Sequence, residues 1–247
     1  MTRFFIPSSQ INGNQVVLEG SDHHHLLNVL RKKVNDQIIV LDGKGQEFLV
    51  RITELSPLKA VGEIVELIDK PTEPRVRITL VQSLPKADKF EYILQKNTEL
   101  GVARFQPIIS ERSTIRINEE SRMKKWERWH KIIKEAAEQS GRKVIPELEM
   151  VQNWKDALPR LRSGLVLIPW EGEKTRSLKA VLEAEKVVPE EVSLIIGSEG
   201  GFSLEEVKEA QARGAIPVTL GPRILRTETA GLVAATAILY HYGELGY

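Results

Sequence analysis

The chain has 247 residues, 41% hydrophobic and 28% charged, the balance of a globular protein with one large domain or two modest ones. It contains no cysteine, which excludes disulfides and thiolate metal sites and favours a reducing cytoplasm as its location. The net charge of +1 excludes a wholesale basic coat. No apolar run approaches the ~18 residues of a membrane span, so no membrane partner is expected.

Residues 1–70 predict a small β-rich domain. A hairpin is expected at Asp42-Gly43-Lys44-Gly45, and one short helix with Ser21 or Asp22 as its N-cap. The strand candidates are short runs rich in β-branched residues, at the spacing of a barrel or sandwich: 4–6, 16–18, 38–41, 48–50 and 60–68.

Two prolines among charged residues at 69–74 indicate a domain boundary. Across 75–247 strands alternate with helices, which predicts an α/β domain with a mostly parallel sheet covered on both faces. A capping box, Ser203-x-x-Glu206, supports one of its helices. The expected strands are 76–81, 105–109, 144–145, 165–168, 192–196 and 216–220, and the expected helices are 89–100, 119–140, 154–161, 178–184, 203–213 and 228–242.

Two glycine-rich turns, 197–201 and 221–226, each follow an expected buried strand. Parallel α/β sheets bind ligands at the carboxyl ends of their strands, and glycine lets the backbone approach a ligand closely. We therefore expect one small-molecule site built from both turns, although tight turns alone would also explain the glycines. Neither turn is a P-loop or a G-x-G-x-x-G sequence, which disfavours ATP and NAD.

These turns also resemble a known family. Residues 197–203 (GSEGGFS) and 220–230 (LGPRILRTETA) resemble the two signatures of the RsmE family. Its members are SPOUT-class methyltransferases that methylate N3 of a uridine in 16S ribosomal RNA with S-adenosylmethionine. Ser198 stands where the family usually has proline. Further similar blocks spread the resemblance over essentially the whole chain: 3–5, 25–31, 96–101 and 135–146.

The resemblance implies a PUA-like, RNA-binding β-barrel over 1–70 and a SPOUT methyltransferase domain with a C-terminal trefoil knot over 75–247. It also implies a homodimer that acts on 16S rRNA or the small ribosomal subunit. The loops of the knot would hold S-adenosylmethionine, largely by backbone contacts. The residues that this implication assigns to the cofactor are Ile168, Pro169, Gly197, Gly201, Leu220, Gly221, Ile224, Leu225 and Arg226.

Methylation at N3 of uracil requires alignment of the nucleophile with the methyl group and loss of a weakly acidic proton. Arg226 is the expected cation that favours the deprotonated base, with Glu199 and Glu228 as polar catalytic partners. A simpler interpretation is open for two of them. Arg226 could only bind a phosphate, and Glu228 could only complement a helix dipole.

Arg3 and Arg31 are the basic residues of the N-terminal domain expected to bind phosphate of the RNA. Gln139 and Arg142 are expected RNA contacts because they fall in a block that resembles the RsmE family. The mixed charges from Arg116 to Lys134 are expected to form a solvated helix face. Three consecutive histidines, 23–25, do not predict a metal site, because successive helical side chains point about 100° apart. We expect them at the surface and expect no metal.

Alternatives remain open at this point. Another SPOUT activity, such as ribose 2′-O or guanine-N1 methylation, differs in the acceptor and not necessarily in the cofactor loops. A non-catalytic RNA-binding ribosome assembly factor is disfavoured by the intact second signature. A small-molecule α/β enzyme would leave the N-terminal domain without an obvious role.

Overall fold

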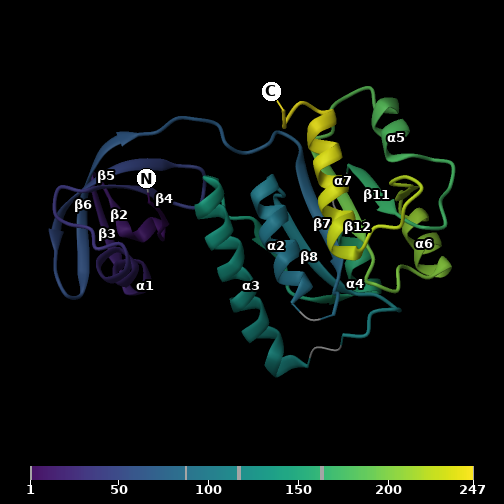
Figure 1. Ribbon diagram of the computed structural model, residues 1–247, viewed down its shortest axis with the longest axis horizontal. Helices are drawn as coiled ribbons and strands as arrows, with labels where there is room; N and C mark the ends of the chain where they lie inside the picture. Colours follow the sequence, from purple (N-terminus) through teal and green to yellow (C-terminus); the bar gives the residue numbers. More distant parts are fainter. Residues whose placement is uncertain (1, 87, 116–117, 162–163, 247) are drawn as a thin grey trace. The chain divides into compact units, whose positions relative to one another are not determined.

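The computed structural model describes residues 2–86, 88–115, 118–161 and 164–246 (Figure 1). The chain divides into two compact units. The first contains Met1–Glu73 together with Ala137–Ile145, and the second contains Pro74–Ala136 and Pro146–Tyr247. The end of the long helix and the turn after it therefore group with the N-terminal residues, a long-range association that periodicity along the sequence does not reveal.

The first unit is built on a six-stranded sheet in which every pair is antiparallel except the parallel pair β1–β4. In the hairpin between β4 and β5, Asp42 Oδ1 accepts hydrogen bonds from the amides of Lys44 and Gln46, at 2.8 and 3.0 Å. The strands in spatial order are β1 (Arg3–Phe5), β4 (Gln37–Leu41), β5 (Glu47–Leu55), β6 (Lys59–Leu67), β3 (Gln15–Glu19) and β2 (Ile11–Asn12).

A short helix, α1 (Gly20–His24), continues as a π-helical turn over His25–Val29. The expected N-cap was wrong: Glu19 takes this position, and no side chain caps the helix. His23 is buried, contrary to the expectation of a surface residue, because its Nε2 lies 2.9 Å from the carbonyl oxygen of Ser56. A buried imidazole nitrogen with a hydrogen-bond partner in the protein does not require a water molecule to satisfy it.

The second unit contains a parallel sheet, which confirms the mostly parallel sheet expected for this region. No strand forms at 144–145, where Val144 makes only an isolated bridge with Lys44. The strands in spatial order are β10 (Gln152–Asn153), β8 (Arg104–Ile109), β7 (Arg77–Ser83), β12 (Glu191–Ile196), β11 (Leu165–Pro169) and β13 (Ile216–Val218), and β9 (Glu147–Leu148) also pairs with β8.

The helix expected over 154–161 ends at Ala157 and is followed by a 3-10 turn over Leu158–Arg160, because Pro159 has no amide hydrogen to continue an α-helix. The other helices of this unit begin and end close to the expected residues. Gly101, with a φ of 107°, ends the first of them, and the predicted capping box of Ser203 and Glu206 is present. None of the helices in the described ranges has the length and apolar character that a bilayer crossing requires. The helices are α2 (Lys89–Leu100), α3 (Glu119–Ser140, whose last turn groups with the first unit), α4 (Trp154–Ala157), α5 (Leu178–Ala184), α6 (Leu204–Gln211) and α7 (Thr227–His241).

Helices α2 and α7 pack against each other, and α7 lies over the central strands β7 and β12 (Figure 1). The facing residues are small or apolar: Gly231 of α7 lies against Leu80 of β7 and Ile196 of β12. This packing fixes the start of α7 close to the carboxyl ends of the central strands, where the glycine turns lie.

Candidate functional site

The two glycine turns follow strands that are not direct neighbours. Strand β11 lies between β12 and β13, and the strands are parallel. The carboxyl end of β11, at Pro169, therefore lies between the turn after β12 and the turn after β13. Three strand ends, rather than two, build this edge of the sheet.

A cavity of about 1050 Å³ opens at this edge, within the second unit. This volume suits a ligand of the size of a cofactor. Eight of the nine predicted cofactor residues line it: Pro169, Gly197, Gly201, Leu220, Gly221, Ile224, Leu225 and Arg226. The ninth, Ile168, is fully buried in the core beneath. The catalytic candidates Glu199 and Arg226 line the cavity, and Glu228 lies beside it, within an ion-pair distance of the lining residue Lys89.

The first turn needs glycine for steric reasons. Gly201 has a φ of 65°, and a Cβ there would lie 2.8 Å from Glu171 Oε1. A Cβ on Gly197 would approach the backbone of Gly201 to 3.1 Å. Glycine suits this turn because it adopts a positive φ without strain and brings no Cβ against the neighbouring main chain.

A buried hydrogen-bond network holds the first turn to the start of α7. The Thr227 hydroxyl donates to the carbonyl oxygen of Gly197 at 2.5 Å and accepts from Gln82 Nε2 at 2.9 Å. Gln82, at the end of β7, is 1% exposed. Sequence reasoning missed Gln82, because a single glutamine in an expected strand carries no functional signal.

The loop after β8 also contacts the first glycine turn and stabilises it. Arg112 Nη1 donates to the carbonyl oxygen of Gly200 at 3.1 Å. Buried Glu206 accepts from the amide of Glu111 at 2.7 Å and from the amide of Ser203 at 2.9 Å. The capping-box carboxylate therefore joins two loops as well as starting α6.

The second turn is more open. Gly221 has a φ of 114°, and its amide donates to the Thr219 hydroxyl at 3.2 Å. Ile224 is 87% exposed, although it lines the cavity, and Arg226 is exposed as the residue that precedes α7. An apolar side chain left this exposed at a cavity rim is available to cover a ligand.

A third loop, after β11, is fixed by Glu173. The amides of Arg176 and Thr175, and then the hydroxyl of Thr175, donate to its carboxylate and lower its pKa to about 2. The loop brings Trp170 and Lys174 to the cavity. Sequence reasoning did not identify this loop beyond its first residues.

Charged groups gather at one wall of the cavity. Lys89 Nζ lies 3.0 Å from Glu199 Oε1 and 3.6 Å from Glu228 Oε2. The hydrogen bond with Glu199 is the main reason that the pKa of Lys89 is raised. Burial raises the pKa of Glu199, but hydrogen bonds from Lys89 and from the amides of Glu199 and Lys86 outweigh it, so this pKa lies below the ordinary value.

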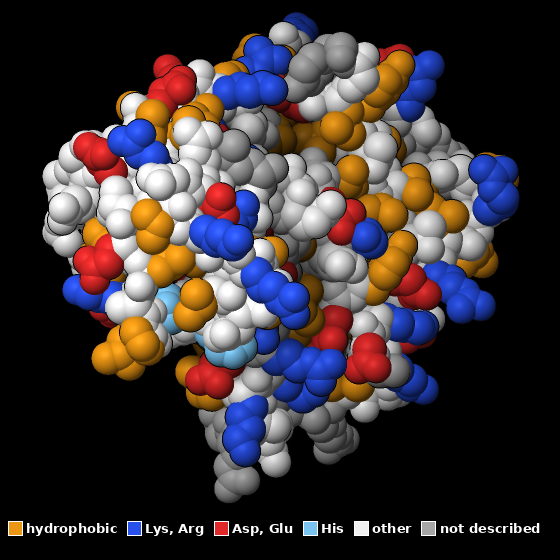
Figure 2. Space-filling view, turned by 60° about the vertical axis from the view of Figure 1, so that its left-hand side comes forward, with side chains coloured by type: hydrophobic (Ala, Val, Ile, Leu, Met, Phe, Trp, Pro, Cys, Tyr) orange, Lys and Arg blue, Asp and Glu red, His pale blue; other side chains and the backbone are white. Residues whose placement is uncertain are grey.

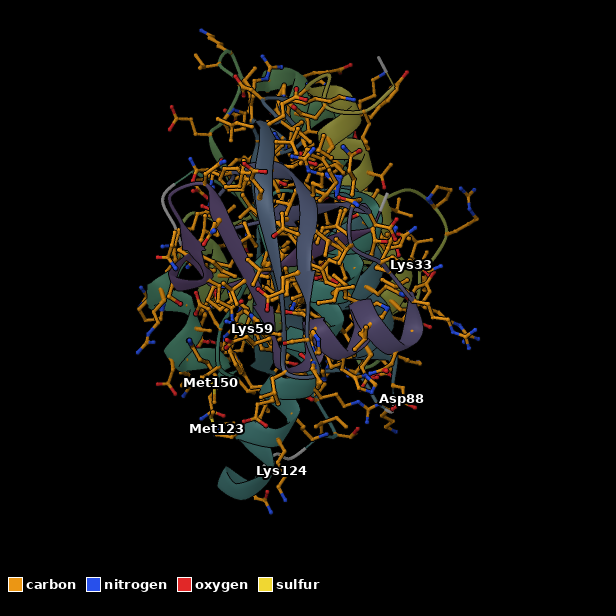
Figure 3. All side chains as sticks on the ribbon, turned by 90° about the vertical axis from the view of Figure 1, so that its left-hand side faces the viewer. Lys33, Lys59, Asp88, Met123, Lys124 and Met150 are labelled. Carbon is orange, nitrogen blue, oxygen red and sulfur yellow. The ribbon has the colours of Figure 1, made fainter. Side chains whose placement is uncertain are left out.

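The RNA-contact candidates lie in two different environments of the first unit. Arg3 pairs with Glu47, and Arg142 is 4% exposed and pairs with Glu73, so both guanidinium groups are bound by carboxylates. Arg31, with a φ of 51°, and Gln139 are exposed. Figure 3 shows Lys33, two residues after Arg31, at the outer edge of this unit.

Two basic residues of α3 are paired with acidic ones. Arg128 lies 2.7 Å from Glu91, and Lys131 lies 3.8 Å from Glu135. Lys124, near the start of the helix in Figure 3, is exposed. Figure 2 shows lysine and arginine side chains interspersed with acidic ones on the face drawn, as on a solvated surface. Arg116 lies outside the described residues.

In the described part of the chain, no group of three or more His, Cys, Asp or Glu side chains is placed to bind one metal ion. The charged groups at the cavity are Lys89 between Glu199 and Glu228, together with Glu171, Lys174, Arg223 and Arg226. Such a set can bind a polar ligand and stabilise charge, and it offers no ligand cluster for a metal.

Comparison with known proteins agrees with this geometry. The family described as "RNA methyltransferase domain" matches residues 72–239, and "RNA methyltransferase PUA domain" matches residues 18–68. Ribosomal RNA small subunit methyltransferase E of Bacillus subtilis is 36% identical over 90% of this chain and 89% of its own. The enzyme of that name from Synechocystis is 32% identical over 96% of this chain and 76% of its own.

A solved structure is similar over nearly the full length. It is a ribosomal RNA small subunit methyltransferase E from Neisseria gonorrhoeae bound to S-adenosyl methionine. It is 34% identical, covers 97% of each chain and gives a TM-score of 0.86. The similarity therefore extends over both units of the chain.

Proposed function

Because this chain belongs to the family of ribosomal RNA small subunit methyltransferases E, we propose that it methylates N3 of a specific uridine in 16S ribosomal RNA. The protein is an S-adenosylmethionine-dependent methyltransferase of small-subunit ribosomal RNA. The proposal concerns the target atom and the residues that act on it. The observation that carries it is the cavity built from the two glycine turns and the end of β11.

The residues of the cavity fit S-adenosylmethionine. Gly197 and Gly201 leave room for main-chain contacts, since a Cβ on Gly197 would crowd the backbone of Gly201 and Gly201 itself has a positive φ. Apolar residues of the second turn, Leu220, Ile224 and Leu225, offer contacts to a nucleoside, and charged residues lie at the same cavity for the amino-acid group. When bound, the cofactor supplies an electrophilic methyl group on a sulfonium.

The chain must align the base and favour loss of its N3 proton. We assign to Arg226 the cation that stabilises the deprotonated uracil, since a guanidinium is always charged. Arg226 directly precedes α7, whose amino end adds positive partial charge. Glu199 and Glu228 are the polar partners at the same wall.

We also propose that the second unit contains a trefoil knot and that the protein is a homodimer. Strand β12 lies between the earlier strands β7 and β11, a crossing that suits the trefoil knot expected for this domain. Helix α7 exposes Val233 (40%) and Tyr240 (68%), which supports a homodimer that covers them. The proposed substrate of the protein is 16S rRNA or the small ribosomal subunit, and this substrate would place the protein in the cytoplasm.

The first unit is the proposed RNA-binding unit. Arg31 and Gln139 are exposed and available for phosphate or base contacts. Arg3 and Arg142 would act differently, because their guanidinium groups already bind Glu47 and Glu73. Their proposed contribution is to shape the surface rather than to neutralise phosphate as free cations.

The test is calorimetric titration with S-adenosylmethionine, followed by mass spectrometry of small-subunit rRNA methylated by the purified protein. We expect one binding site per chain and one new 3-methyluridine. Cofactor binding without any methylation of the rRNA would indicate a non-catalytic RNA-binding ribosome assembly factor. A methyl group on ribose O2′ or guanine N1 would instead assign the protein to another methyltransferase activity of the SPOUT class.

A further inference from the structure

Lys89 connects three elements at the wall of the cavity. It is the first residue of α2 and follows Asp88, which is labelled in Figure 3. Its ammonium group lies 3.0 Å from Glu199, in the first glycine turn, and 3.6 Å from Glu228, in the first turn of α7. One cation therefore stands between two carboxylates that come from different strand ends.

Glu199 has a second attachment to the same region. The amide of Lys86 donates to its two carboxylate oxygens, at 3.1 and 3.4 Å. The carboxylate is thus held both by the main chain before α2 and by the side chain of Lys89. Two-thirds of each side chain of the Lys89–Glu199 pair is shielded from solvent, with exposures of 33% and 34%.

The protonation states agree with a structural role for this pair. The pKa of Lys89 is raised and that of Glu199 is lowered, so both groups are charged at neutral pH. A carboxylate whose pKa lies below the ordinary value is a weaker base than a free one. The surroundings of Glu199 therefore oppose its use as a proton acceptor.

We propose that Lys89 is a positioning residue, which holds Glu199 and the first glycine turn against the start of α7 in the form that binds the cofactor. Glu199 then acts as a polar partner at the cavity by anchoring the turn, and it does not accept the N3 proton. Without the ammonium group, Glu199 and Glu228 would repel each other and the turn would open. This inference rests on the proposed function of the same cavity.

The experiment compares the full-length variants Lys89→Met, Glu199→Gln and the double substitution. Calorimetry gives the Kd for S-adenosylmethionine, and steady-state methylation of small-subunit rRNA gives kcat and KM. Each single change should weaken cofactor binding about tenfold, which corresponds to about 1.4 kcal/mol. The kcat at saturating cofactor should fall less than the affinity, and the double variant should bind no more weakly than either single one.

Two further variants serve as rescue and control. Lys89→Arg keeps the charge and should restore most of the affinity. Lys96→Met removes a lysine of the same helix with nearly the same exposure (34%), paired at 2.7 Å with Glu99, and should leave cofactor binding unchanged. Thermal unfolding of every variant checks that the fold is retained.

Three results would overturn the inference: unchanged cofactor affinity in Lys89→Met, additive losses in the double variant, or a Glu199→Gln protein that binds the cofactor normally and loses kcat. The last result would make Glu199 a catalytic residue. A wild-type protein without cofactor binding or methylation would remove the proposed function itself, whereas an active wild type with an unaffected Lys89→Met variant would remove only the role of Lys89.

Discussion

The hydroxyl group of Thr227 donates a 2.5 Å hydrogen bond to the carbonyl oxygen of Gly197, thirty residues earlier in the chain. Gln82 donates to the same hydroxyl, so β7, the turn after β12 and the start of α7 share one buried network. Buried polar networks of this kind stabilise a single arrangement, because each group left without a partner is costly. The network therefore holds the first glycine turn against the start of α7 at the wall of the cavity.

Thr227→Val tests this network. Valine has a similar shape but cannot donate or accept, so the carbonyl of Gly197 keeps only the longer hydrogen bond from Gln82 Nε2, at 3.4 Å, and Gln82 loses an acceptor. We expect the free energy of unfolding to fall by about 1–3 kcal/mol, with weaker cofactor binding. Urea denaturation and calorimetry measure the two effects. Thr236→Val on the same helix, where the hydroxyl bonds only locally to Leu232, should leave cofactor binding unchanged. Similar losses of cofactor affinity in both variants would refute the role of the network.

Gly201→Ala tests the need for glycine in the first turn. A residue with a Cβ at a φ of 65° costs about 1–2 kcal/mol, and here the Cβ also meets the carboxylate of Glu171. We expect lower stability together with a loss of affinity for S-adenosylmethionine. Gly214→Ala is the matched control, since its φ is 87° and no atom lies within 4 Å of the new Cβ. It should lose stability and keep cofactor affinity, and a Gly201→Ala protein with normal affinity would contradict the account.

The carboxylate of Glu173 should make the stability of the third loop depend on pH. Hydrogen bonds from the amides of Arg176 and Thr175 lower its folded-state pKa to about 2 from 4.5. A lowered pKa stabilises the fold above 4.5, and this contribution disappears as the pH falls towards 2. The wild type should therefore exceed Glu173→Gln in unfolding free energy at neutral pH, and the difference should shrink over that window. A difference that does not change with pH would exclude this origin.

Replacing Arg31 or Arg142 in the first unit should have two different effects, one on RNA affinity and one on protein stability. Arg31→Ala should weaken binding to small-subunit rRNA and reduce the slope of its salt dependence by about one, with little change in stability. Arg142→Met should instead destabilise the protein by about 1–3 kcal/mol, because Glu73 loses its buried cation and keeps the hydrogen bonds from the amides of Lys143 and Val144. Filter binding at several salt concentrations and thermal unfolding distinguish the two. Unchanged RNA affinity in Arg31→Ala would argue against this unit as the RNA contact.

Local sequence features predicted much of the framework. Helix ends marked by a glycine or a capping box, such as Gly101 and Ser203, lie where they were expected. The glycine turns were recognisable because positive φ and close approach leave few other choices of residue. The nine expected cofactor residues came from the resemblance to the RsmE family, and eight of them line the cavity, with Ile168 in the core beneath it.

Long-range pairing was not predictable from one sequence. Lys89 lies 110 residues from Glu199, and Gln82 lies 145 from Thr227, so neither contact leaves a local pattern. The position of β11 between β12 and β13 depends on the order of strands in the sheet. The pairing of Arg142 with Glu73 likewise converted an expected surface cation into a buried one.

The central claim is that the two glycine turns and the end of β11 form one cradle for S-adenosylmethionine. A crystal structure of the protein soaked with this cofactor tests it most directly. The account predicts the cofactor inside the cavity, in contact with the main chain at Gly197, Gly201 and Gly221. Cofactor bound at another surface, or an empty cavity at saturating concentration, would contradict it.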